Sequence, residues 1–396
     1  MCHHEGGSAP FSLLTYEDVA KRTSFIKKVV NDRYMPPWKA DPHYVSFSNE
    51  RILSDKEIKT ITDWINSKAP KGNPSDLKSK VNFIEGTRLN RKPDLVLSLK
   101  HPFIVKGDNQ ERFMVFCIPY QLSEDQNVEA IEFYSTNYKL IHHANFGFHQ
   151  TFSSIDTSGL PESVDLLNGP EKYGAYSILS EKLVYYSGWI PGTSYESYPG
   201  NMGWVMPKKG MVLFYVHYAP SPIDVKINSE IHLFFKKTPI ERVISVVNIG
   251  TGGKGDIDPP LIIQPDSILK VKATILSKKD QSLLFAWPHM HLLGKSFKAY
   301  AITPLKDTIP LIYIPSWDFN WQDIYKYRKL IKIPAMSVIT IEAEYDNTKE
   351  NPHNPFSPPR LITSDQNLIM KTTDEMLNLL LIFLPYQPGD ENISLE

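Results

Sequence analysis

The sequence predicts a mainly β protein with two β-sandwich domains, preceded by a small all-α domain. Three observations support this prediction. The chain has 396 residues, too many for one ordinary core. Its 31 prolines and 20 glycines separate many short runs of Val, Ile, Tyr and Phe, which is typical of strands joined by turns. Before residue 73, the pattern is helical instead.

The first 72 residues carry the helical signals. The stretch from Tyr16 through Val30 predicts one helix. Ser54 and Glu57 have the capping-box spacing that begins a second helix, and an amphipathic pattern follows them. Residues 73–92 are polar, which indicates a linker. We therefore expect a helical domain over 1–72.

From residue 93 onward, short apolar runs replace the helical pattern. Runs of this length bounded by turn residues are typical of β-sandwiches. A division near Pro239 gives two domains of similar size, 93–239 and 240–396. The runs are Leu95–Leu97, Phe113–Ile118, Ala130–Phe133, Leu140–Phe148, Met211–Tyr218, Ile231–Phe235, Val243–Ile249, Leu269–Ile275, Leu283–His291, Lys298–Ile302, Val338–Tyr345 and Leu377–Leu384.

Composition excludes some classes of function. Lysine plus arginine (43) nearly balance aspartate plus glutamate (44), so we expect no basic surface for nucleic acid. No apolar run reaches the roughly 18 residues of a transmembrane helix, so we expect no membrane span in this chain. With Cys2 and Cys117 as the two cysteines, a disulfide framework is not expected.

The segment from Pro288 to Gly294 carries the clearest chemical signal. Its aromatic flanks predict a strand, and residues i and i+2 of a strand share a face, so His289 and His291 can direct two imidazoles at one small volume. Two neutral imidazoles suit copper, zinc, nickel or iron. Met376 would add a thioether, which selects copper(I) over zinc. The alternative is that these side chains pack in the core without a metal.

The first predicted sandwich offers His142, His143 and His217. Adjacent residues of a regular strand face opposite ways, so His142 and His143 can share a metal only where the strand twists, bulges or ends. With His217 from another aromatic strand, the three imidazoles would suit copper or zinc.

The order and domain placement of these six residues resemble the ligands of the copper type II, ascorbate-dependent monooxygenases, which include peptidylglycine α-hydroxylating monooxygenase and dopamine β-hydroxylase. The resemblance covers both predicted sandwiches, with Leu-Leu-Gly after His291 and Thr-Asp-Glu before Met376. It implies two jelly-roll-like domains that face each other, with one copper ion on each. It implies an electron-transfer copper on His142, His143 and His217. The catalytic copper, where O2 is activated, would lie on His289, His291 and Met376.

The resemblance implies an enzyme that hydroxylates a C–H bond of a small organic substrate, using O2 and an electron donor. Each turnover consumes two electrons, and each copper stores one. Three positions differ from the peptide-amidating members: Trp287 replaces an arginine, Leu380 a tyrosine and Tyr215 a glutamine. A C-terminal glycine peptide is therefore not the expected substrate. The cysteine framework of the animal enzymes is missing too, which suggests a bacterial relative.

The N-terminal residues resemble a c-type haem motif. Cys2-His3 is similar to the end of Cys-x-x-Cys-His, and Met35 precedes a proline pair. This implies a cytochrome c-like domain with haem c, in which Cys2 forms a thioether, His3 is the proximal ligand and Met35 is the distal ligand. The first cysteine of the motif is absent. Either the start is misassigned and a signal peptide with that cysteine is lost, which we favour, or haem is no longer attached covalently. A haem c protein would be periplasmic or secreted.

Three functions follow from these patterns. The first is a copper monooxygenase that receives electrons through a fused haem domain or from an ascorbate-like reductant. The second is a non-catalytic copper-binding or electron-transfer protein with the same ligands. The third is a structural double sandwich that binds sugars or proteins, with histidines that never meet. Consumption of O2 by the reduced protein separates the first two.

Overall fold

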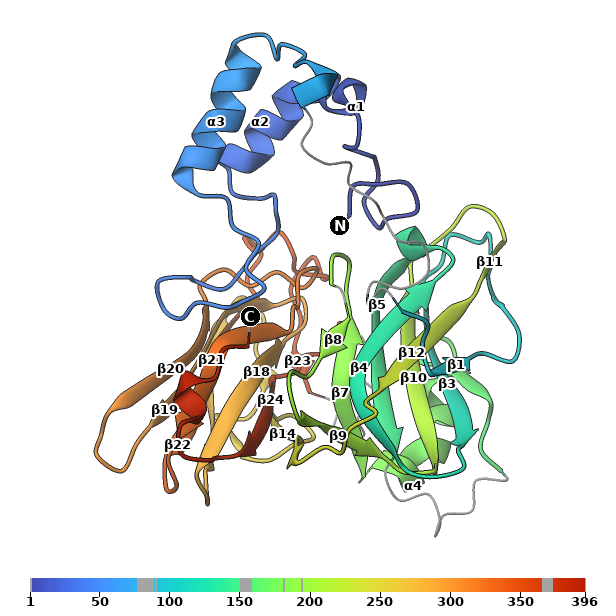
Figure 1. Ribbon diagram of the computed structural model, residues 1–396, viewed down its shortest axis with the longest axis vertical. Coiled ribbons are helices and arrows are strands. Elements are labelled where there is room, and N and C mark those ends of the chain that lie inside the picture. The colour runs from blue at the N-terminus through green and yellow to red at the C-terminus, as the bar shows by residue number, and fades with distance from the viewer. Residues whose placement is uncertain are drawn as a thin grey trace.

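The computed structural model describes residues 2–76, 89, 91–149, 159–180, 182–193, 195–364 and 373–395. The protein is mainly β, as predicted. Two groups of strands lie side by side, and the N-terminal helices lie at one end of them (Figure 1). The sheets of residues 95–243 are called the first sandwich, and those of residues 245–385 the second sandwich.

The N-terminal helices are α1 (Tyr16–Ala20), α2 (Thr23–Asn31) and α3 (Asp55–Asn66), followed by the 3-10 turn η1 (Pro74–Asp76). The prediction of one continuous helix from Tyr16 is wrong, because the chain leaves the helical conformation at Arg22, with φ −126° and ψ 12°. The predicted capping box at Ser54 and Glu57 is confirmed. α1 and α3 bury none of their side chains completely, so these helices have little core of their own.

The first sandwich consists of two sheets with a shared apolar core. The ring of Phe133 in one sheet lies 6.0 Å from that of Phe214 in the other. The first sheet has the order β1-β12-β4-β9-β13, with β8 also on β4: β1 (Leu95–Ser98), β4 (Gln126–Ser135), β8 (Glu196–Ser197), β9 (Met202–Met206), β12 (Ser229–Phe235) and β13 (Arg242–Val243). The second has the order β6-β3-β10-β5-β7: β3 (Arg112–Gln121), β5 (Ile141–His149), β6 (Ser163–Asp165), β7 (Leu183–Trp189) and β10 (Lys209–Tyr218).

Shorter elements complete the first sandwich. They are the ribbon of β2 (Phe103–Val105) and β11 (Val225–Ile227), the 3-10 helices η2 (Tyr138–Leu140) and η4 (Pro170–Tyr176), and α4 (Ser177–Ser180).

The second sandwich has the same general plan. Its four-stranded sheet has the order β14-β24-β18-β21: β14 (Ser245–Gly250), β18 (Gln281–His289), β21 (Tyr325–Ile333) and β24 (Asn378–Pro385). Its five-stranded sheet has the order β15-β17-β22-β19-β20: β15 (Ile257–Asp258), β17 (Ile268–Leu276), β19 (Gly294–Ile302), β20 (Thr308–Ile314) and β22 (Val338–Asp346). A ribbon of β16 (Ile262–Ile263) and β23 (Ile362–Thr363) and the 3-10 turn η5 (Asp390–Asn392) complete it.

The two sandwiches pack tightly on each other. Phe285 of β18 belongs to the same apolar cluster as the first-sandwich core, and its ring stacks 6.1 Å from that of Tyr198. Arg242 at the end of the first sandwich makes a buried bidentate ion pair with Asp390, with N–O distances of 2.6 and 2.8 Å. This contiguous packing fixes how the two sandwiches face each other. Within the described residues, no helix is long and apolar enough to cross a membrane.

Candidate metal centres

The first candidate centre lies at one edge of the first sandwich, where the ends of three neighbouring strands come together. β10 pairs with β5 so that His217 is opposite His143, and Tyr218 is opposite Ile141. His142 is therefore the extra residue of a β-bulge, the condition that allows His142 and His143 to serve one site. The ring centroid of His217 lies 4.8 Å from that of His142 and 5.3 Å from that of His143. The structure thus brings the three histidines together.

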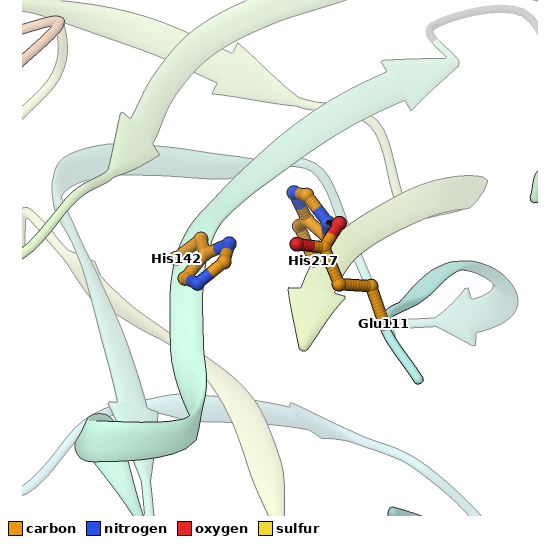
Figure 2. A group of neighbouring side chains, drawn as sticks. All are labelled: Glu111, His142 and His217. Carbon is orange, nitrogen blue, oxygen red and sulfur yellow. Dashed lines mark hydrogen bonds and ion pairs between the residues drawn. The ribbon is translucent and has the colours of Figure 1, made fainter. Parts of the chain in front are cut away.

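A carboxylate that sequence analysis missed joins this cluster. Glu111 directly precedes β3, and its Oε2 lies 3.0 Å from Nε2 of His217. One ligand atom each from Glu111, His142 and His217 lies within 4.8 Å of the other two (Figure 2). Nδ1 of His217 is buried and finds no hydrogen-bond partner within the described part of the chain. These nitrogen and oxygen donors fit a copper ion or another transition metal.

The protonation states of this centre suit metal binding. Burial, reinforced by the charge of His217, lowers the pKa of His142. Burial and His217 also hold the pKa of His143 well below its ordinary value. The hydrogen bond with His217 lowers the pKa of Glu111, although burial raises it. Near neutral pH, His142 and His143 are therefore neutral ligands beside an ionised carboxylate, which are the forms that bind metal.

The second candidate centre contains His289, the last residue of β18, and His291. Their ring centroids lie 4.9 Å apart, with the rings nearly perpendicular at 81°. Nδ1 of His289 donates to Oε1 of Gln322 at 2.5 Å, and Nδ1 of His291 donates to the carbonyl oxygen of Asp374 at 2.9 Å. Each ring therefore carries its lone pair on Nε2. Burial lowers the pKa of His289 to about 3, so this imidazole is neutral.

A buried glutamate connects the two chain segments of this centre. The Glu375 carboxylate accepts hydrogen bonds from the backbone N–H of His291 at 3.0 Å and from that of Leu293 at 2.6 Å. Burial raises the pKa of Glu375 to about 8, although these hydrogen bonds favour the ionised form. Glu375 thus ties the loop after β18 to the segment before β24, and sequence analysis had assigned it no role.

Met376 follows Glu375 directly. β24 pairs with β18 as far as His289 opposite Asn378, two residues after Met376, and the two residues before Met376 hydrogen-bond with His291. The carbonyl oxygen of Met376 accepts a hydrogen bond from the Tyr345 hydroxyl at 2.6 Å, which fixes the backbone at this point. The structure therefore places Met376 at the same end of the sheet as the two histidines.

The two centres face each other across the junction of the sandwiches. His289 and His291 each lower the pKa of His143, an electrostatic effect that requires proximity. Trp287, two residues before His289, lies against the first sandwich beside Gly188. One histidine of the first centre is thus within electrostatic reach of both histidines of the second.

The three positions that differ from the peptide-amidating enzymes are filled by packed side chains. Trp287 of β18 is directly opposite Leu380 of β24. Tyr215 is buried, and its hydroxyl lies 2.8 Å from that of Tyr173 and 3.2 Å from that of Tyr185. These positions provide no cationic group for a peptide carboxylate.

The N-terminal residues do not form one site in the described structure. Nδ1 of His3 donates to the carbonyl oxygen of Phe11 at 3.0 Å, which leaves the lone pair on Nε2. Met35 lines a cavity of about 560 Å³ with Trp38, and neither Cys2 nor His3 lines this cavity. The predicted proximal and distal haem ligands are therefore not brought together on one cavity wall.

Comparisons with known proteins give no family. No protein-family model and no curated protein matches the chain. A solved structure of the VP2 subviral particle of infectious bursal disease virus is similar at 9% identity, covering 76% of this chain and 75% of that chain, with a TM-score of 0.20. A structure of PNGF-II is similar at 10% identity, covering 73% and 59%, with a TM-score of 0.21. Likenesses this weak carry no argument.

Proposed function

We propose that this chain is a copper-dependent monooxygenase of the copper type II, ascorbate-dependent family, built on two jelly-roll-like domains. It would hydroxylate a C–H bond of a small organic substrate with O2, receiving electrons through a haem domain or from an ascorbate-like reductant. The proposal depends chiefly on one observation. Three imidazoles come together on the first sandwich, two more come together on the second, and the two sandwiches pack directly on each other.

Each group of residues would have its own role. His142, His143 and His217 would hold the electron-transfer copper, and His289, His291 and Met376 the catalytic copper. Copper, when bound, supplies one-electron storage at each centre and activation of O2 at the second. Gln322 and Glu375 orient the second-centre ligands through the hydrogen bonds described above. Trp287 and Leu380 are apolar and supply no cation for a peptide carboxylate, which favours an uncharged substrate.

Haem c on the N-terminal helices is part of the proposal. His3 has the ligand tautomer, with Nδ1 bonded to a backbone carbonyl. α3 is amphipathic and buries no side chain completely, so its apolar face is only partly covered. Cys2, His3 and Met35 would bind this haem, which requires His3 and Met35 to move together from the separate places that they have in the described structure. Since haem c is attached outside the cytoplasm, the protein would be periplasmic or secreted.

The decisive experiment measures copper per chain after reconstitution and desalting, together with O2 consumption by the reduced protein. We expect about two coppers, falling to about one when His289 and His291 are both changed to alanine. Two coppers without O2 consumption across a panel of small apolar substrates would instead favour a non-catalytic copper-binding or electron-transfer protein. No copper, or one copper that survives the double change, would contradict both proposals.

A further inference from the structure

At this edge of the first sandwich, a carboxylate adds a ligand atom to those of the three histidines. β3, β10 and β5 are consecutive neighbours in one sheet. β3 carries Glu111 directly before its first residue, β10 carries His217 next to its last residue, and β5 carries the bulged His142. Three separate backbone segments therefore direct an oxygen and two nitrogens at the same volume (Figure 2).

One distance within this group matches that expected on a common metal ion, and the wider spread of up to 4.8 Å would close when the ion binds. Ligand atoms at about 2.0–2.2 Å from one transition metal lie roughly 3–4 Å from one another. Oε2 of Glu111 and Nε2 of His217 are 3.0 Å apart, and the three ligand atoms lie within 4.8 Å of one another. His143 is opposite His217 in the sheet but is not part of this group. Its neighbours include His289 and His291 of the second sandwich.

The burial of His217 distinguishes the group from a chance surface cluster, although His142 is exposed. The His217 side chain is 3% exposed, while that of Glu111 is 44% exposed. The second nitrogen of His217, Nδ1, is buried without a partner among the residues that the structure describes. A buried imidazole with one nitrogen on a carboxylate and the other unsatisfied is costly in the metal-free protein. An ion shared by Glu111 and Nε2 of His217 would replace the hydrogen bond between these two groups and would move the imidazole proton to Nδ1.

We propose that Glu111 is a metal ligand, and that Glu111, His142 and His217 form a site that favours divalent ions over Cu+. A carboxylate is a hard, anionic donor, so it stabilises Cu2+ or Zn2+ more than the soft Cu+ ion. The inference rests on the proposed function in treating this cluster as the first copper centre. With this carboxylate, the first centre would hold Cu2+ more tightly than a centre of three imidazoles alone.

The test needs no turnover. Metal affinities are measured by competition with chelators on the full chain carrying His289→Ala and His291→Ala, so that the first centre is observed alone. The probes are Zn2+, and Cu+ under anaerobic reducing conditions. In Glu111→Gln we expect the Zn2+ affinity to fall more than about tenfold and the Cu+ affinity to change less than about threefold. Asp108→Asn, a charge-matched change at a neighbouring carboxylate paired with Arg112, should leave both affinities unchanged.

Two results would overturn the proposal. The amide oxygen of Glu111→Gln can still accept the Nε2–H hydrogen bond of His217, so unchanged Zn2+ affinity would mean that the carboxylate only orients His217. Equal losses of Zn2+ and Cu+ affinity, with unchanged thermal unfolding, would remove the preference for divalent ions. Because neither readout involves O2 or substrate, either result is distinguishable from failure of the monooxygenase proposal.

Discussion

Trp287 of the second sandwich occupies the space that Gly188 of the first leaves open. A Cβ added to Gly188 would lie 2.6 Å from Cη2 of the indole and 2.6 Å from Oδ1 of Asn145. No side chain fits there unless the indole moves, and the indole is held two residues before His289. This contact therefore sets the separation of the two candidate centres.

Gly188→Ala should therefore disturb the junction. Overpacking of this kind typically costs about 1–3 kcal/mol of unfolding free energy, and we expect a loss in that range in urea titrations. We also expect O2 consumption to fall while two coppers remain bound, because each centre keeps its own ligands. Gly174→Ala is the matched control, since a Cβ at Gly174 meets nothing within 4 Å. Equal effects of the two changes would show that the contact with Trp287 has no special role.

Met376→Leu tests the thioether directly. Leucine keeps the apolar volume and removes the sulfur, so hydroxylation should be lost while copper at His142, His143 and His217 remains. The measurement combines copper content with O2 consumption. Full activity in this variant would exclude Met376 as a ligand.

Gln322 should act as a positioning residue for His289. Its Nε2 donates to the carbonyl of Phe319 at 2.8 Å, which turns Oε1 toward Nδ1 of His289. Gln322→Ala removes the acceptor that selects the ligand tautomer, so copper affinity at the second centre should fall about 10–100-fold. Gln322→Glu still offers an acceptor oxygen and should restore most of that affinity in the same competition titration. A loss that Glu does not rescue would indicate a structural role only.

The sequence predicts the ligands of these centres where they are close together in the chain, and it misses those that are far apart. His289 and His291 lie two residues apart, so the strand pattern predicted that they share a site, and they do lie together although β18 ends at His289. The adjacent pair His142-His143 required a bulge, which the sequence could name as a condition but could not locate, because bulges are set by pairing with the neighbouring strand. Glu111 lies 106 residues from His217, and no local pattern connects them.

The strands and helices were likewise predictable only where a local pattern marks them. Continuous apolar runs such as Met211–Tyr218 correspond to buried central strands. β21 was not predicted because its lysines and arginine interrupt the apolar run that the prediction depended on, and β6 and β8 are too short to give a period. In the N-terminal segment, the break at Arg22 has no Gly or Pro to mark it. Tertiary contacts, which the sequence does not display, decided these cases.

Adding a cysteine upstream of Cys2 tests the N-terminal proposal. A chain extended to a complete Cys-x-x-Cys-His motif and exported with a cytochrome c maturation system should carry covalent haem, seen as a c-type absorbance spectrum. His3→Ala in that chain should remove the proximal ligand, and Met35→Ala should change the spectrum of the low-spin form. Absence of covalent haem would leave residues 1–72 without the proposed cofactor, while the copper centres would be unaffected.

The buried ion pair of Arg242 and Asp390 should make the junction of the sandwiches sensitive to acid. Burial raises the pKa of Asp390, but hydrogen bonds from Arg242 and Ser282 outweigh this and hold the pKa below its ordinary value of 3.8. An acid with a lowered folded-state pKa stabilises the fold above its unfolded pKa, and this contribution is lost as the pH falls through the folded pKa. Asp390→Ala leaves Arg242 buried and unpaired, so at pH 7 it should cost about 3–5 kcal/mol.

The difference between wild type and Asp390→Ala in urea unfolding should therefore be constant above about pH 5 and should shrink below the ordinary pKa of 3.8. Glu391→Ala, at the exposed neighbour of Asp390, is the control and should stay within about 0.5 kcal/mol of wild type. A pH-independent difference would mean that Asp390 stabilises the junction through packing alone.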